Sequence, residues 1–227
     1  RLLASPAYGE RFGRHWLDVA RFAESSGMES NVLYPHAWRY RDFVVDAMNR
    51  DMPFDEFLKK QLAGDLLEAS GPDERAENLV ATGYLALGAK SHNSRDPREF
   101  SLNLVDEQID SMSQGMLGLT VSCARCHDHK FDPILHADYY AMAGILISTR
   151  TMENLNTVAR VRERPLAPIA EIAASKAHAE ARKKNEAAIA AANAEGSRRL
   201  GDAWSNRTAD VMLLASELER TPRVFEA

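Results

Sequence analysis

Residues 102–127 of the chain read LNLVDEQIDSMSQGMLGLTVSCARCH, and this segment decides how the fold is interpreted. Apolar residues recur in it every three or four positions, the period of a helix with one buried face. They are Leu102, Val105, Ile109, Met112, Met116 and Leu119. The pattern predicts a helix over 102–119 that leads directly to the only two cysteines, Cys123 and Cys126, with His127 immediately after them.

The same spacing predicts further helices on both sides of this segment, over about 6–23, 37–49, 53–70, 76–87 and 138–149. The polar stretch 91–98 is predicted to be a loop. No segment alternates apolar and polar residues with a period of two, as strands would. We therefore expect an all-α fold, an irregular helical domain built around the cysteine motif.

The composition changes after Arg164, and residues 170–195 contain 12 alanines in 26 positions. Such a stretch has high helix propensity but little bulky core material. Gly196 and Gly201 are expected to interrupt the helix, and Val211, Leu214 and Leu218 predict a returning one. The expected organisation is a domain over 1–164 and an Ala-rich helical hairpin or coiled-coil-like arm over 165–227, as a fragment of a longer multidomain protein.

Length and composition exclude several classes of protein. The 227 residues are 45% apolar and 27% charged, which is ordinary for a globular chain and unlike collagenous, disordered or disulfide-scaffold proteins. The formal net charge of −5 argues against a nucleic-acid partner, since phosphate binding needs clustered cations. The longest apolar run, 139–147, is too short for a transmembrane segment, which needs about 20 residues.

The arrangement Cys-x-x-Cys-His is the attachment signature of a c-type haem. Cys123 and Cys126 would form the thioether bonds to the porphyrin, and His127 would be the proximal iron ligand. An iron-bound imidazole needs its other nitrogen oriented by a carbonyl or carboxylate, and we expect the segment 128–133 to supply that group. The predicted cofactor is one covalent haem c.

Three other interpretations of the cysteines are open. Zinc could be bound by Cys123, Cys126, His129 and a distant ligand, although structural zinc sites usually combine two close-spaced ligand pairs. A thioredoxin-like dithiol would need a βαβ setting. A disulfide across so short a loop would restrict the unfolded chain little.

The remaining candidate site residues come from helical spacing. His15 is a distal iron-ligand candidate, and further candidates for that position are His36, His92, Met112, Met116 and Met142. His15 and Asp18 are three residues apart, as are Glu107 and Asp110, so each pair projects from one side of its helix. Together with His129 they are the candidates for a catalytic or second-metal site beside the haem, against the alternative that they are ordinary solvated polar residues.

The stretch CARCHDHKFDPI at 123–134 closely resembles the planctomycete-type cytochrome c domains of large secreted proteins. The segments 2–22, 37–42, 61–65, 106–110 and 117–121 are similar to the same family. The resemblance implies an extracytoplasmic multidomain protein, periplasmic, secreted or at the cell surface, whose partners are neighbouring domains or a redox protein, with carbohydrate as a possible substrate. Electron transfer, a haem-dependent oxidoreductase and an interaction scaffold all remain open at this point.

Overall fold

The computed structural model of the chain describes residues 1–28, 30–92, 94–155 and 159–220. It divides into two units, Arg1–Ala167 and Pro168–Ala227, and each is described by itself. The described residues form seven α-helices and no strand, apart from two isolated bridges. This confirms the predicted all-α class. No helix in these ranges is both long and apolar enough to span a bilayer.

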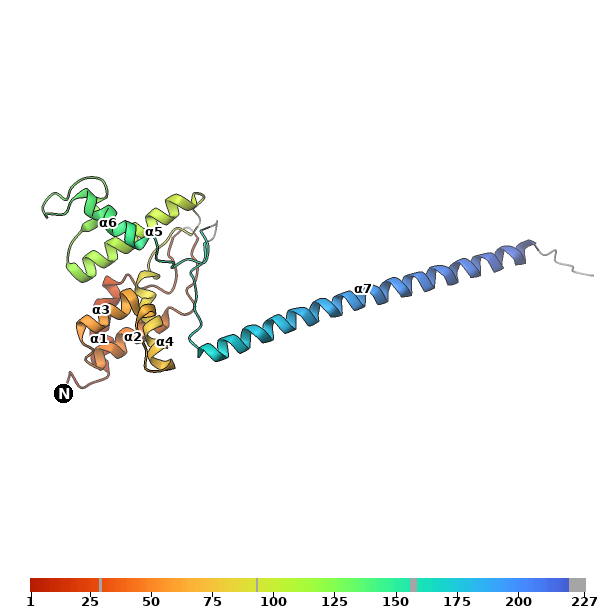
Figure 1. Ribbon diagram of the computed structural model, residues 1–227, viewed down its shortest axis with the longest axis horizontal. Helices are drawn as coiled ribbons and strands as arrows, with labels where there is room; N and C mark the ends of the chain where they lie inside the picture. Colours follow the sequence, from red (N-terminus) through yellow and green to blue (C-terminus); the bar gives the residue numbers. More distant parts are fainter. Residues whose placement is uncertain (29, 93, 156–158, 221–227) are drawn as a thin grey trace, which may run out of the picture. The chain divides into compact units, whose positions relative to one another are not determined.

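The described residues of the first unit form six α-helices and four short helical turns (Figure 1). The α-helices are α1 (Ala7–Val19), α2 (Trp38–Asn49), α3 (Phe54–Ala63), α4 (Pro72–Ala81), α5 (Pro97–Met112) and α6 (His136–Leu146). The turns are the 3₁₀ segments η1 (Gly64–Leu66), η2 (Thr82–Leu85) and η4 (Val121–Arg125) and the π-helical η3 (Ser113–Leu117).

The core of α1 to α4 is aromatic and contains a buried polar centre. Trp16 stacks against Tyr84 and meets the edge of Phe57. The indole nitrogen of Trp16 donates to Gln61 Oε1 at 2.8 Å, and the Tyr40 hydroxyl donates to the same oxygen. Buried polar groups need such partners, so these hydrogen bonds fix how three helices meet.

A second core holds α5 and α6 side by side (Figure 1). Val105 and Ile109 of α5 pack there with Tyr139 and Leu146 of α6. Val121 and Ala124 of η4 are buried in the same core. The cysteine motif is thus built directly onto the surface of the predicted 102–119 helix.

Helix α5 differs from its prediction at both ends. It begins at Pro97 because the Asp96 carboxylate accepts the backbone N–H groups of Arg98 and Glu99, an N-cap within the stretch predicted to be a loop. After Met112 the chain continues as the π-helical η3 and stops at Gly118, whose φ of 65° is left-handed.

The described residues of the second unit form one helix, α7 (Ile169–Arg220). The expected interruption at Gly196 and Gly201 and the returning helix are wrong, since α7 continues through both glycines. A glycine inside a helix costs only about 1 kcal/mol relative to alanine, which the surrounding Ala-rich sequence offsets. Of the two expected forms of the arm, the hairpin is therefore excluded for the described part of α7.

Candidate haem-attachment site

The two thiols lie on the outer side of η4. A 3₁₀-helix has three residues per turn, so residues i and i+3 lie above one another. Val121 and Ala124 take the inner positions and are buried, whereas Cys123 and Cys126 are exposed and unbonded. The apolar contacts of the inner pair therefore set the outward direction of the cysteines.

Arg125, between the cysteines, fastens the motif to α5. Its guanidinium donates to Asp106 Oδ2 at 2.8 Å and to Asn103 Oδ1 at 3.4 Å. The hydroxyl of Tyr139 donates to the other Asp106 carboxylate oxygen at 2.6 Å. Tyr139 is buried, and its burial raises the pKa of the phenol. The backbone carbonyl of Arg125 accepts from Tyr140 at 3.2 Å. Side chain and backbone of this residue are thus both held, which leaves the flanking thiols facing outward on a fixed turn.

His127 is exposed and its ring is oriented by the backbone that follows it. Nδ1 lies 2.7 Å from the carbonyl oxygen of Asp128, and because a carbonyl can only accept, Nδ1 is the donor. The unprotonated nitrogen is then Nε2, the one able to bind a metal. The orienting group lies within the predicted segment 128–133. The Asp128 carboxylate also accepts from the N–H of His136 at 2.7 Å, which ties this loop to the start of α6.

His129 has a different role. Nδ1 accepts the backbone N–H groups of Phe131 and Asp132, at 3.3 and 2.9 Å, so Nε2 carries the proton and donates to Thr120 Oγ1 at 2.9 Å. The side chain is only 5% exposed. Since both nitrogens have partners, His129 organises the loop after the motif.

Apolar side chains flank the motif on the outside of the unit. Phe131 is 82% exposed, and Leu117, Leu135 and Tyr140 are each more than half exposed. All four lie in chain segments next to the motif, and exposed apolar side chains can bind an apolar ligand. A porphyrin is an apolar plate, so these side chains fit the chemistry of a haem held by the cysteines.

The side chains at the motif can be compared with what each cofactor needs. Within residues 1–28, 30–92, 94–155 and 159–220, no three Cys, His, Asp or Glu side chains converge closely enough to hold a metal ion. A structural zinc site needs four ligands around one point. A c-type haem needs only the imidazole at the iron, because the thiols bond to carbon atoms at the porphyrin edge. The residues present at the motif therefore fit a c-type haem.

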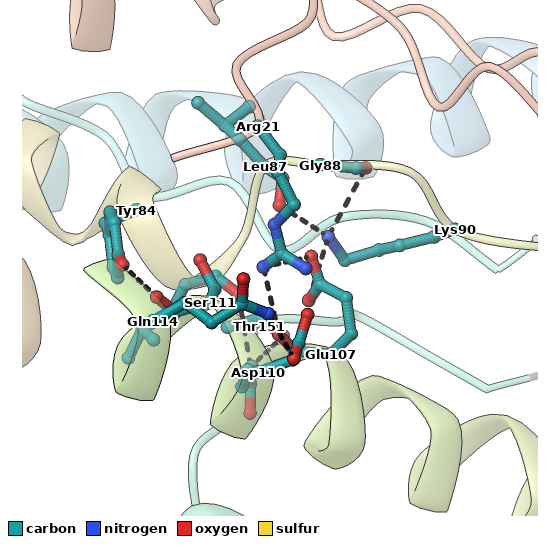
Figure 2. A network of polar contacts seen from close by, with 12 residues as sticks. Arg21, Tyr84, Leu87, Gly88, Lys90, Glu107, Asp110, Ser111, Gln114 and Thr151 are labelled. Atoms are coloured by element: carbon teal, nitrogen blue, oxygen red, sulfur yellow. Dashed lines mark hydrogen bonds and ion pairs between the residues drawn. The ribbon is translucent and has the colours of Figure 1, made fainter. Parts of the chain in front are cut away.

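The helical pairs predicted to form a catalytic or second-metal site are not assembled as one. His15 and Asp18 are exposed on α1. Asp110 accepts from Gln114 one helical turn away. Glu107 instead turns toward the loop after η2, where it meets Arg21 and Lys90 (Figure 2). The further candidates for the distal iron ligand have other surroundings. Met112 and Met142 pack against the core of α5 and α6, and Met116 packs against the core of α1 to α4. His92 is fully buried, whereas His36 is exposed.

The network around Glu107 contains the polar residues that the sequence reasoning missed. Arg21 Nη2 lies 2.9 Å from Glu107 Oε1, and Lys90 Nζ lies 3.8 Å from Oε2. Burial raises the pKa of Glu107, which both cations oppose, and burial lowers the pKa of Lys90 to about 8. Arg21 and Glu107 are 86 positions apart, so helical periodicity gives no signal for their contact.

The chain was compared with known families, curated proteins and solved structures. A family described as PSCyt2, Protein of unknown function (DUF1549), matches residues 1–151. This range covers α1 to α6 and the whole cysteine motif. No curated protein and no solved structure matches the chain.

Proposed function

We propose that this chain, which belongs to the family described as PSCyt2, Protein of unknown function (DUF1549), carries one covalent c-type haem and transfers electrons outside the cytoplasm. The observation that carries the proposal is the orientation of His127. Its Nδ1 donates to the Asp128 carbonyl, which leaves Nε2 for iron, directly beside two outward-facing thiols.

The roles of the chain's residues follow from their positions. A bound haem would supply a reversible one-electron change at its iron. Cys123 and Cys126 would hold the porphyrin edge, and Asp128 would keep the imidazole of His127 in the iron-binding tautomer. Phe131, with the neighbouring exposed apolar side chains, would exclude water from the porphyrin face. Burial and hydrogen bonding of this kind are how proteins tune redox potential.

Electron transfer is favoured over an oxidoreductase that acts on a carbohydrate or another substrate. The enzyme alternative expected a substrate to bind beside the haem with the help of candidates among His15, Asp18, Glu107, Asp110 and His129. Instead, His129 has both nitrogens bonded, and Glu107 forms ion pairs with Arg21 and Lys90. A relay needs no such group, only a held cofactor and a partner, which we propose is a neighbouring domain or a separate redox protein.

The test is production of the chain together with a haem-attachment system, followed by optical spectra in oxidised and reduced forms. The wild-type chain should show a c-type spectrum that survives denaturation. Cys123→Ala combined with Cys126→Ala should lose all covalent haem. His127→Ala should keep the haem but change the spin state of its iron, since the thioether bonds do not depend on the imidazole.

His178→Ala is the matched control, because His178 is an exposed histidine of α7 and the substitution is the same. It should leave the spectrum unchanged. Covalent haem in the double cysteine variant, or an unchanged spectrum in His127→Ala, would contradict the proposal. If the wild-type chain carried no haem under these conditions, the proposal would be wrong, and a role as an interaction scaffold would be the remaining alternative.

A further inference from the structure

A cavity of about 300 Å³ lies on the side of α5 that carries Glu107. Lys90 and Glu107 both line it. The other polar lining residues are Ser91, Ser94, Glu99 and Asn103, and the apolar ones are Met28, Ala89, Phe100 and Leu104. A concave, largely apolar space with a few convergent polar groups is the usual form of a small-molecule site.

Lys90 is held with its amine against a carboxylate in a nearly water-free position. The residue is 5% exposed, and Nζ lies 3.8 Å from Glu107 Oε2. Nζ also donates to the Leu87 carbonyl at 2.8 Å (Figure 2). Burial of a lysine disfavours its charged form, which is how nucleophilic lysines are produced.

The backbone around this pair is shaped to admit the Glu107 carboxylate. Gly88 has a φ of 105°, and a Cβ there would lie 2.6 Å from Glu107 Oε1. Arg21 has a φ of 53°, uncommon for a residue other than glycine, and its guanidinium pairs with the same oxygen. The uncommon backbone of Arg21 and the missing Cβ of Gly88 thus both serve one carboxylate, and strained backbone is often found at functional sites.

We propose that Lys90 forms a reversible imine with a short-chain aldehyde or ketone bound in this cavity. Nζ adds to the carbonyl carbon, so that a C–N bond forms as the C=O double bond opens. The carbonyl oxygen then leaves as water with one proton from the amine and one from the Glu107 carboxyl. Neutral amine, carbonyl compound and carboxylic acid become a protonated imine, a carboxylate and one water.

The proton count of the existing pair matches this reaction. A charged lysine beside a carboxylate holds the same number of protons as a neutral amine beside a carboxylic acid. The product imine retains one N–H, which can keep the hydrogen bond to the Leu87 carbonyl. The Glu107 carboxylate would remain beside the positive imine as its counter-ion. The proposal is independent of the haem and does not rest on it.

The lining of the cavity indicates the class of carbonyl compound. Its volume limits the ligand to a small molecule. Ser94 and Asn103 supply a hydroxyl and an amide for hydrogen bonds, which suit hydroxyl groups on the ligand. A short hydroxyaldehyde or hydroxyketone is therefore the expected ligand, and glycolaldehyde is a suitable probe.

The pKa of Lys90, about 8, makes the reaction measurable near neutrality. Near pH 8 far more of the Lys90 amine is neutral than for an exposed lysine with an ordinary pKa. Lys59 is the internal comparison, since it is exposed and its Asp55 partner raises its pKa.

The experiment treats the wild-type chain at pH 8 with glycolaldehyde and cyanoborohydride, which reduces an imine to a stable amine, and quantifies labelling by peptide mass spectrometry. Lys90 should be labelled at least tenfold faster than Lys59. Glu107→Gln should lower labelling at Lys90 roughly tenfold and leave Lys59 unchanged, because it removes the proton donor. Loss of the carboxylate charge would lower the pKa of Lys90 further and increase its neutral fraction, so a fall in labelling cannot come from the ionisation of the amine.

The proposal would be overturned if Lys90 of the wild-type chain were labelled no faster than Lys59. Lys90 would then be a structural group that binds the Leu87 carbonyl. That comparison needs no variant, so it stands even if Glu107→Gln fails to fold. Equal labelling of Lys90 in folded Glu107→Gln and in the wild type would also contradict the role given to the carboxyl.

Discussion

Arg21 and Gly88 show how single residues are selected by a contact far away in the sequence. Arg21 follows the end of α1 with a left-handed φ of 53°, at a position where helices often place glycine. A side chain there costs roughly 1 kcal/mol or more. The arginine is explained by its guanidinium, which reaches Glu107 Oε1 at 2.9 Å and the Glu107 carbonyl at 2.9 Å.

Gly88→Ala should destabilise the first unit by roughly 2–3 kcal/mol. It combines a left-handed backbone with a Cβ placed 2.6 Å from Glu107 Oε1. Gly27→Ala is the matched control, since Gly27 also has a positive φ, 63°, but open space around it. The control should cost about 1 kcal/mol. Urea unfolding measures both, and equal losses would contradict the claim that Gly88 makes room for the carboxylate.

At the scale of elements, α1 and α2 pack closely because α1 carries small residues on the contact face. Gly9 is buried against the backbone of α2, and its N–H donates to Asn49 Oδ1 at 2.8 Å. The Asn49 amide also donates to the Pro6 carbonyl at 3.0 Å. The start of α1 is therefore satisfied by a residue of α2, so formation of this helix end depends on tertiary packing.

Gly9→Ala should destabilise the unit by about 2 kcal/mol, since the new Cβ would lie 2.4 Å from the Val45 carbonyl oxygen. Gly13→Ala, one turn later on the same helix, would place its Cβ 3.4 Å from the nearest atom, an ordinary contact. It should be neutral or stabilise by up to about 1 kcal/mol, because alanine favours helix over glycine. Thermal unfolding of the two variants measures their stability. An equal loss of stability in both would contradict the claim that α1 approaches α2 most closely at Gly9.

At the scale of the whole molecule, the stability of the first unit should depend on pH through Lys90. Its folded pKa of about 8 lies below the ordinary value of 10.5. Between these values the unfolded chain binds more protons, so stability rises with pH. Above pH 10 the trend should reverse, because burial raises the pKa of Tyr34 to about 12 and its ionisation then favours unfolding.

The free energy of unfolding should therefore increase by roughly 1–2 kcal/mol between about pH 8 and 9.5. Lys90→Met keeps the length of the side chain without its charge, and should remove most of this slope. Urea titrations at several pH values measure the effect. A slope that persists in Lys90→Met would assign the dependence to other groups.

Local signals in the sequence predicted most of the fold. The periodicity of residues 37–49 predicted α2 to within one residue, and that of 102–119 predicted the body of α5. The start of α5 was missed, although Asp96 followed by Pro97 is a recognisable N-cap, because the surrounding stretch is polar. The continuity of α7 was missed because two glycines were given more weight than the propensity of the residues around them.

The geometry of the candidate site was also predictable only in part. The direction of the two thiols follows from their spacing of three, and the group that orients His127 lies in the very next residue. The hydrogen bonds of His129 and the meeting of Glu107 with Arg21 and Lys90 depend on tertiary contacts, for which helical spacing carries no information. Spacing alone therefore placed Glu107 on a shared site with His15, where the structure gives it other partners.

The most direct test of the central claim is the mass of a proteolytic peptide that contains both Cys123 and Cys126, taken from the chain made together with a haem-attachment system. Covalent attachment predicts that this peptide carries the mass of one haem after denaturation and extraction. The same peptide at its unmodified mass, from protein made under those conditions, would contradict the account.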